Sequence, residues 1–127
     1  MHNIQSPRTD DSAIEQEIQA KGKTAPRVTP TDLKANIIDE YYFTAGEAVQ
    51  PTIKPTKDNP FGDAPEALNL LTFCVLVLRN GFTVTGESAC ASPDNFDAEI
   101  GKKIARENAV QKVWPLMGYA LKEQLAK

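Results

Sequence analysis

The dipeptide Asn80-Gly81 lies between two strand-like runs, and it constrains the fold of this chain more than any other feature. The runs are residues 70–79 (LLTFCVLVLR) and 82–89 (FTVTGESA), which are rich in β-branched and aromatic residues. An Asn-Gly pair suits a two-residue type I′ turn, because both positions of that turn need positive φ. The sequence therefore predicts an antiparallel hairpin in which Arg79 opposes Phe82 and Val77 opposes Val84.

The first strand of this hairpin is apolar on both of its faces, so we expect both faces to be covered. A two-stranded hairpin by itself is only marginally stable. Helices and a second copy of the chain are the available cover, and the sequence therefore predicts an oligomer. In the expected register one face carries Phe73, Val75, Val77 and Val84, and the other carries Cys74, Leu76 and Leu78.

Two shorter segments have the signals of helices before the hairpin. Residues 10–20 place Ile14 and Ile18 one turn apart, and Gly22 follows as a stop signal. The run Thr29-Pro30-Thr31-Asp32 has the composition of an N-cap, a proline at the first helical position and an acidic residue at the third. Apolar residues every four positions then predict a helix that ends between residues 43 and 46.

Residues 97–126 have the pattern of one long helical region. Pro115 removes a backbone donor and clashes with the carbonyl of Gln111, so we expect a kink or a restart there. The apolar side of this helix is predicted to carry Ile100, Ile104, Val113, Met117 and Leu121.

The chain has 127 residues, of which 41% are hydrophobic, and this suits one small domain. Residues 1–10 are predicted to be a flexible tail, and residues 11–127 a single domain. Four prolines between residues 50 and 65 predict a long loop without a regular element. The expected fold class is α+β: a small antiparallel hairpin or sheet with packed helices and a long C-terminal helical region.

Composition argues against several classes of function. A net charge of −3 disfavours duplex DNA as a partner, and no run approaches 18 consecutive apolar residues, so we expect no membrane partner. His2 is the single histidine, and Cys74 and Cys90 lack a CxxC spacing, so no metal site is expected. Without a glycine-rich phosphate loop or a histidine to activate a nucleophile, we expect no catalytic residue, no cofactor and no enzyme.

The stretch 92–100 (SPDNFDAEI) has two interpretations. In the first it is only a helix start, with Asp94 or Asn95 as the N-cap. In the second it forms the edge of a phosphate-binding site, in which Asn95 acts together with the cations Lys102, Lys103 and Arg106. Phe82, next to the turn, is either a core residue or a stacking surface for a base.

A resemblance favours the second interpretation. The segment 80–125 (NGFTVTGESACASPDNFDAEIGKKIARENAVQKVWPLMGYALKEQL), with YYFTA upstream, resembles a family of small tailed-phage proteins named for members from the phages N4 and Sf6. The likeness covers residues 28–49 and 68–126. This family looks similar to the Thoeris anti-defence proteins, which hold cyclic nucleotide immune signals, such as cyclic ADP-ribose isomers, without cleaving them.

The resemblance implies a dimer or hexamer with pockets between subunits, acting in the cytoplasm of the infected bacterial host. It assigns base stacking to Phe82, polar recognition to Asn95 and phosphate binding to Arg106. It also includes Arg27 among the ligand-binding residues. Lys102 and Lys103 stand where an arginine would give bidentate phosphate contacts, whereas lysine provides only a point charge. The alternative hypothesis is a phage structural or protein-interaction accessory protein with no small-molecule ligand.

Overall fold

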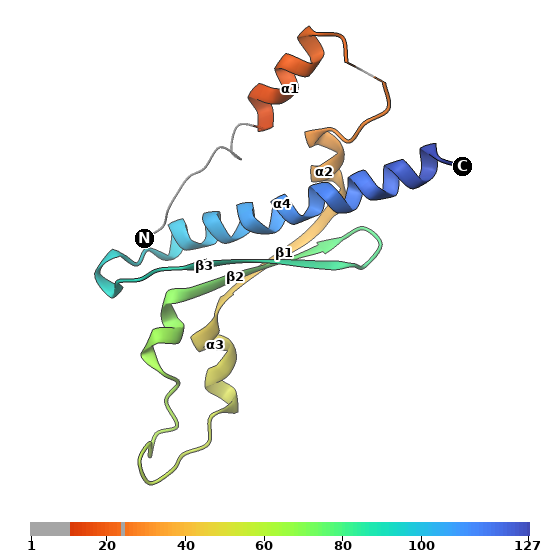
Figure 1. The fold of residues 1–127 in the computed structure, drawn as a ribbon. Coiled ribbons are helices and arrows are strands. Elements are labelled where there is room, and N and C mark those ends of the chain that lie inside the picture. The colour runs from red at the N-terminus through yellow and green to blue at the C-terminus, as the bar shows by residue number, and fades with distance from the viewer. Residues whose placement is uncertain (1–10, 24) are drawn as a thin grey trace.

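A computed structural model describes residues 11–23 and 25–127 (Figure 1). Its centre is a three-stranded antiparallel sheet in the order β1-β2-β3, formed by Ile37–Thr44, Leu71–Leu78 and Thr83–Ala89. The long helix α4, Ala98–Leu125, lies along one face of this sheet. The remaining helices are α1 (Asp11–Ala20), α2 (Pro30–Asn36) and α3 (Ala45–Val49). The predicted α+β class with a long C-terminal helix is confirmed.

The hairpin is present, but its predicted register was wrong by one residue. Val77 pairs with Thr83 and Leu76 pairs with Val84. The backbone N–H of Leu78 donates to the carbonyl of Phe82 at 2.8 Å, so the turn contains the three residues 79–81, with Gly81 at φ +92°. A one-residue shift moves a whole strand to the opposite face. Val84 therefore lies with Cys74, Leu76 and Leu78, and not with Val75 and Val77 as expected.

The second predicted helix is much shorter than expected. Its start is as predicted: Thr29 accepts from the N–H of Asp32 at 3.1 Å, and Asp32 accepts from the N–H of Thr29 at 3.0 Å. The helix ends at Asn36, however, and residues 37–44 form the edge strand β1. This segment (IIDEYYFT) is rich in β-branched and aromatic residues, and pairing with β2 overrides its four-residue periodicity.

The face of the sheet beneath α4 is closed by very close packing. Cys74 and Leu76 are fully buried there, and so are Ala105, Ala109 and Val113 of α4. A Cβ atom at Gly86 of β3 would overlap the carbonyl oxygen of Ala105 and the backbone nitrogen of Ala109. Small residues on both elements therefore let the helix backbone rest against the sheet.

This close packing corrects the predicted apolar side of α4. The residues of α4 that are buried are Gly101, Ala105, Ala109, Val110 and Val113, whereas the predicted Ile100 is 45% exposed. The prediction is confirmed for Val113, which is fully buried, and for Met117, which packs against the core. Next to Gly86, however, the short gap to β3 admits only the small side chains of Ala105 and Ala109. The helix continues through Pro115 without a restart.

The start of α4 also differs in detail from the prediction. Its N-cap is Asp97, whose Oδ1 accepts from the N–H groups of Glu99 and Ile100 at 2.9 and 3.2 Å. Asp94 and Asn95, the predicted caps, lie in the preceding 3-10 turn, Pro93–Asn95. Two more short 3-10 turns, Gln50–Thr52 and Glu66–Leu70, flank the proline-rich loop.

The loop after α3 is held by its own side chains. The Gln50 amide donates to the carbonyl of Gly62 at 2.7 Å and accepts from the N–H of Ala64 at 2.8 Å. Residues 50–52 form a 3-10 turn, so the prediction of no regular element was wrong at that point. The predicted flexible tail, residues 1–10, lies outside the described residues.

The opposite face of the sheet, here called the open face, is not covered by α4 (Figure 1). The register places Tyr41, Phe43, Phe73, Val75 and Val77 on it. Phe43 and Phe73 stack with ring centroids 5.5 Å apart, and Tyr41 is 57% exposed. Phe73, Val75 and Val77 are only half-buried.

Among the described helices, none is long and apolar enough to span a membrane.

Candidate functional site

The six residues predicted to bind a ligand do not converge in one chain. Phe82 follows the hairpin turn and is 57% exposed. Asn95, Lys102 and Lys103 are exposed at the other end of the sheet, near the start of α4. Seven residues of β3 separate the two groups, and at about 3.3 Å per residue this is roughly 23 Å. A ligand of nucleotide size cannot touch both groups of one chain.

Arg27 and Arg106, in contrast, lie on the two sides of one cleft. The cleft runs between α1, α2 and α4 around Trp114, and we call it the Trp114 cleft. It consists of two adjoining hollows of about 300 and 260 Å³. Both hollows are lined by Asp11, Pro30, Gln111 and Trp114. Arg27 lines the first hollow, and Arg106 lines the second together with Lys34.

Helix α1 forms the outer wall of the Trp114 cleft and is attached mainly by polar contacts. None of its residues is buried. Arg27 donates to both carboxylate oxygens of Glu15, at 2.7 and 2.6 Å. The indole Nε1 of Trp114 donates to Oδ2 of Asp11 at 3.3 Å. The helix ends as predicted, with Gly22 at φ +68°.

Arg27, the cation of the first hollow, is already paired with Glu15. The hydrogen bonds from Arg27 lower the pKa of Glu15 to about 2, so this carboxylate stays ionised at neutral pH. Both oxygens of Glu15 face the guanidinium in a bidentate pair. A ligand phosphate would have to displace Glu15 to take both donors, and Arg27 therefore acts mainly as the anchor of α1.

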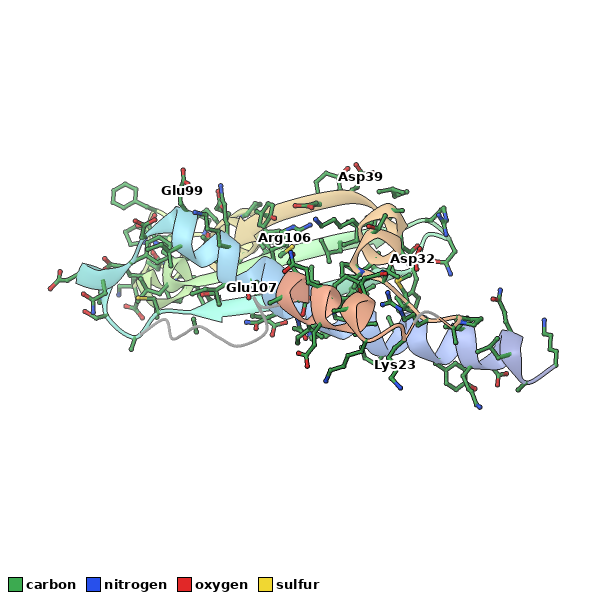
Figure 2. All side chains as sticks on the ribbon, turned by 90° about the horizontal axis from the view of Figure 1, so that it is seen from above. Lys23, Asp32, Asp39, Glu99, Arg106 and Glu107 are labelled. Atoms are coloured by element: carbon green, nitrogen blue, oxygen red, sulfur yellow. The ribbon has the colours of Figure 1, made fainter. Side chains whose placement is uncertain are left out.

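Arg106 is more available to a ligand than Arg27. Its Nε donates to Oε2 of Glu40 at 3.0 Å, and Oε1 of Glu40 accepts from the hydroxyl of Tyr42 at 2.8 Å. Within residues 11–23 and 25–127, no partner is found for its two terminal nitrogens. Those nitrogens can therefore form a fork for a phosphate or carboxylate. Figure 2 shows Arg106 and Glu107 beside α1, where they line the second hollow.

The second hollow is close to neutral in charge. Its cations Arg106 and Lys34 are matched by the carboxylates of Asp11 and Glu107, and Asp11 already accepts from Trp114. Apolar atoms of Leu33, Val110 and Trp114 form much of its lining. The arrangement suits a ring against Trp114 with one anionic group at Arg106.

Cys74 lies next to this network but is not a reactive thiol. Burial is the main cause that raises its pKa, and its side chain has no exposed surface. Burial and the hydrogen bond to Glu40 likewise raise the pKa of Tyr42. Both groups are therefore protonated at neutral pH, and the hydroxyl of Tyr42 donates to Glu40, which in turn accepts from Arg106.

Sequence reasoning missed Trp114, Lys34 and Gln111 as members of the cleft. Trp114 directly follows the predicted apolar residue Val113, and this position indicated packing and not ligand binding. The signal that distinguishes it is its polar N–H, which needs a partner when half-buried. The contact with α1 was invisible in the sequence, since Asp11 lies 103 residues away.

The fold and the cleft together define the class of this protein. It is a small α+β protein with a three-stranded sheet, one long helix on the sheet and the Trp114 cleft between α1, α2 and α4. Residues 28–125 match the model of the Phage protein (N4 Gp49/phage Sf6 gene 66) family. The chain belongs to this family, as the resemblance indicated. In comparisons with curated proteins and with solved structures, nothing matched.

Proposed function

We propose that this phage protein counters bacterial immunity by binding a cyclic nucleotide signal, such as a cyclic ADP-ribose isomer, and holding it without cleavage. Membership of a phage family supports the setting, which would be the cytoplasm of the infected host. The similarity of this family to signal-sequestering anti-defence proteins supports the activity. The observation that carries the proposal is the fork of Arg106 beside Trp114 in one cleft.

Each part of the cleft matches one part of such a ligand. The indole face of Trp114 offers a surface for a base, and the free edge of Arg106 offers two parallel donors to a phosphate. The hollow of about 260 Å³ at Arg106 is small for a whole cyclic dinucleotide. We therefore expect one base and one phosphate to enter the cleft of a given chain, with the rest of the ligand outside.

Self-association would complete the site. Phe82, Asn95, Lys102 and Lys103 are all exposed and lie at two opposite ends of the sheet. A second copy on the open face would lie across the sheet from the Trp114 cleft, so these residues of another chain would reach the ligand only through a further interface, as in a hexamer. The apolar side chains of the open face give the driving force for this dimer or hexamer.

Sequestration without chemistry is part of the proposal. Among the described residues, no group of three His, Cys, Asp or Glu side chains could hold a metal ion. The nearest thiol, Cys74, is buried and protonated. Asp97 caps α4 and Glu40 is bound to Arg106, so these two carboxylates have structural partners.

The test is retention and return of an intact ligand. Purified protein is mixed with cyclic ADP-ribose isomers, the free nucleotide is quantified after ultrafiltration, and the bound fraction is released by heat and analysed chromatographically. Arg106→Ala should weaken binding about ten- to a hundred-fold, because a charge-assisted hydrogen bond contributes roughly 1.5–3 kcal/mol. The matched control is Lys122→Ala, an exposed cation at the other end of α4, which should bind as the parent does.

The melting temperature separates binding from folding in this test. The Arg106–Glu40 pair is more than one third exposed on the arginine side, so its loss should change stability by only about 0–1 kcal/mol. Equal binding by Arg106→Ala and the parent would refute the role of the cleft. A product peak that grows with time and protein would refute sequestration.

The open face favours one other function. Its apolar side chains suit a phage structural or protein-interaction accessory protein that carries no small-molecule ligand. Failure of every cyclic nucleotide to be retained, with a stable oligomer still present, would favour this alternative.

A further inference from the structure

A third cavity lies at the hairpin end of the molecule, away from Arg106. It measures about 590 Å³, which is within the range of small-molecule sites. It is bounded by α2, by the turn at Arg79 and Asn80, and by the last third of α4, and we call it the hairpin pocket. Its apolar lining comes from Val28, Ala35, Met117, Ala120 and Leu121.

Two side-chain amides of the hairpin pocket use their oxygens to accept from the backbone, and this leaves their NH2 groups as donors. Oδ1 of Asn80 accepts from the backbone N–H of Phe82 at 2.9 Å. Oδ1 of Asn36 accepts from the backbone N–H of Arg79 at 3.2 Å and shares this donor with its own carbonyl oxygen at 2.9 Å. An amide nitrogen cannot accept from a backbone N–H, so these contacts determine which way each amide points. The Nδ2 groups of Asn36 and Asn80 remain as donors, with no described partner.

Arg79 adds a cation whose charge is not neutralised. Its side chain is exposed, and within residues 11–23 and 25–127 its guanidinium has no ion pair. The other arginine of the lining, Arg27, is bound to Glu15. Asp32 is the single carboxylate among the described lining residues, and its Oδ2 accepts from the N–H of Thr29. The lining thus offers donors and one free positive charge.

We propose that the hairpin pocket binds a small organic anion, a phosphate or carboxylate group carried on an apolar body of about one ring. The anionic group pairs with the guanidinium of Arg79 and accepts from Nδ2 of Asn36 and Asn80. The apolar body rests on Met117 and Leu121. This proposal does not depend on signal sequestration, because Arg106 and Trp114 take no part in this pocket.

The experiment uses phenyl phosphate as the probe and the full-length protein. Saturation-transfer NMR measures its binding, and phenol and inorganic phosphate are titrated as the two halves of the probe. We expect saturable binding of phenyl phosphate that is at least tenfold tighter than that of either half. Arg79→Gln should lower the affinity at least tenfold, because the charge-assisted contact is lost.

Lys122→Gln is the matched control, since Lys122 lies on α4 beside the lining residue Leu121 but does not line the pocket. It should bind phenyl phosphate as the parent does. Arg79 is exposed, so both variants should have the melting temperature of the parent. Equal binding by Arg79→Gln and the parent, or the same loss in both variants, would overturn the proposal, as would non-saturable binding. A loss on Arg106→Ala alone would also overturn it, because the probe would then occupy the Trp114 cleft.

Discussion

The two faces of the sheet differ in how deeply their apolar residues are buried. Beneath α4, Cys74 and Leu76 are fully buried against alanines of the helix. On the open face, Phe73, Val75 and Val77 alternate with them along the same strand but stay half-buried. The strand β2 therefore contributes apolar side chains both to the buried core and to a partly exposed surface.

The apolar side chains of β2 are covered less completely on the open face than on the face beneath α4. The closed face depends on small residues, because Gly86 meets the backbone of α4 directly. The open face depends on large residues such as Tyr41 and Phe43, which extend outward from the edge strand. Large exposed apolar side chains on a sheet are typical of a surface that binds another protein chain.

The largest loss of stability is expected when a methyl group is added at Gly86, beneath α4. Gly86→Ala should destabilise the fold by more than about 4 kcal/mol or prevent folding, because the new Cβ overlaps backbone atoms of Ala105 and Ala109. The control is Gly118→Ala in α4, where a Cβ has open space. This change should stabilise by roughly 0.5–1 kcal/mol. Thermal unfolding by circular dichroism measures both, and similar stability of the two variants would contradict the close packing.

Truncation of Leu76 and of its neighbour Val75 on β2 should lower the stability by different amounts. Leu76→Ala should cost about 2–5 kcal/mol, because Leu76 has no exposed surface and its loss leaves a cavity. Val75→Ala, on the open face, should cost about 1 kcal/mol or less in the isolated chain. Chemical denaturation at low protein concentration compares them. An equal cost for both would mean that the open face is covered within a single chain.

The smallest effect on folding, and the clearest on assembly, is expected from a charge on the open face. Val75→Lys should reduce self-association and give a particle near the 13.9 kDa of one chain, because a charge is costly in an apolar interface. Gln16→Lys, exposed on α1, is the control and should leave the oligomer intact. Light scattering at several concentrations measures the mass. A parent protein of single-chain mass would refute the proposed self-association.

Several features of this protein depend only on local chemistry and could be predicted from neighbouring residues. The capping box at Thr29 and Asp32 and the glycine stop at Gly22 need only neighbouring residues, and both are present. The hairpin at Asn80-Gly81 and the long C-terminal helix follow from turn composition and periodicity. The family hallmark is also local, and it identified the phage family.

Tertiary structure decided what depends on contacts between distant segments. Residues 37–44 became a strand because β2 offered an unpaired edge, although their spacing also suits a helix. The three-residue turn shifted the register by one, and the shift moved Val84 into the core. Asp97, two residues after the predicted Asn95, became the cap of α4.

The candidate site shows the same division. Of the predicted ligand-binding residues, only Arg27 and Arg106 lie on one cleft, and their carboxylate partners Glu15 and Glu40 come from other elements. Trp114 joined the site through a contact with Asp11 that spans 103 positions. Local sequence sets the propensity of a residue, but only packing sets its neighbours, because the distance between segments depends on the whole fold.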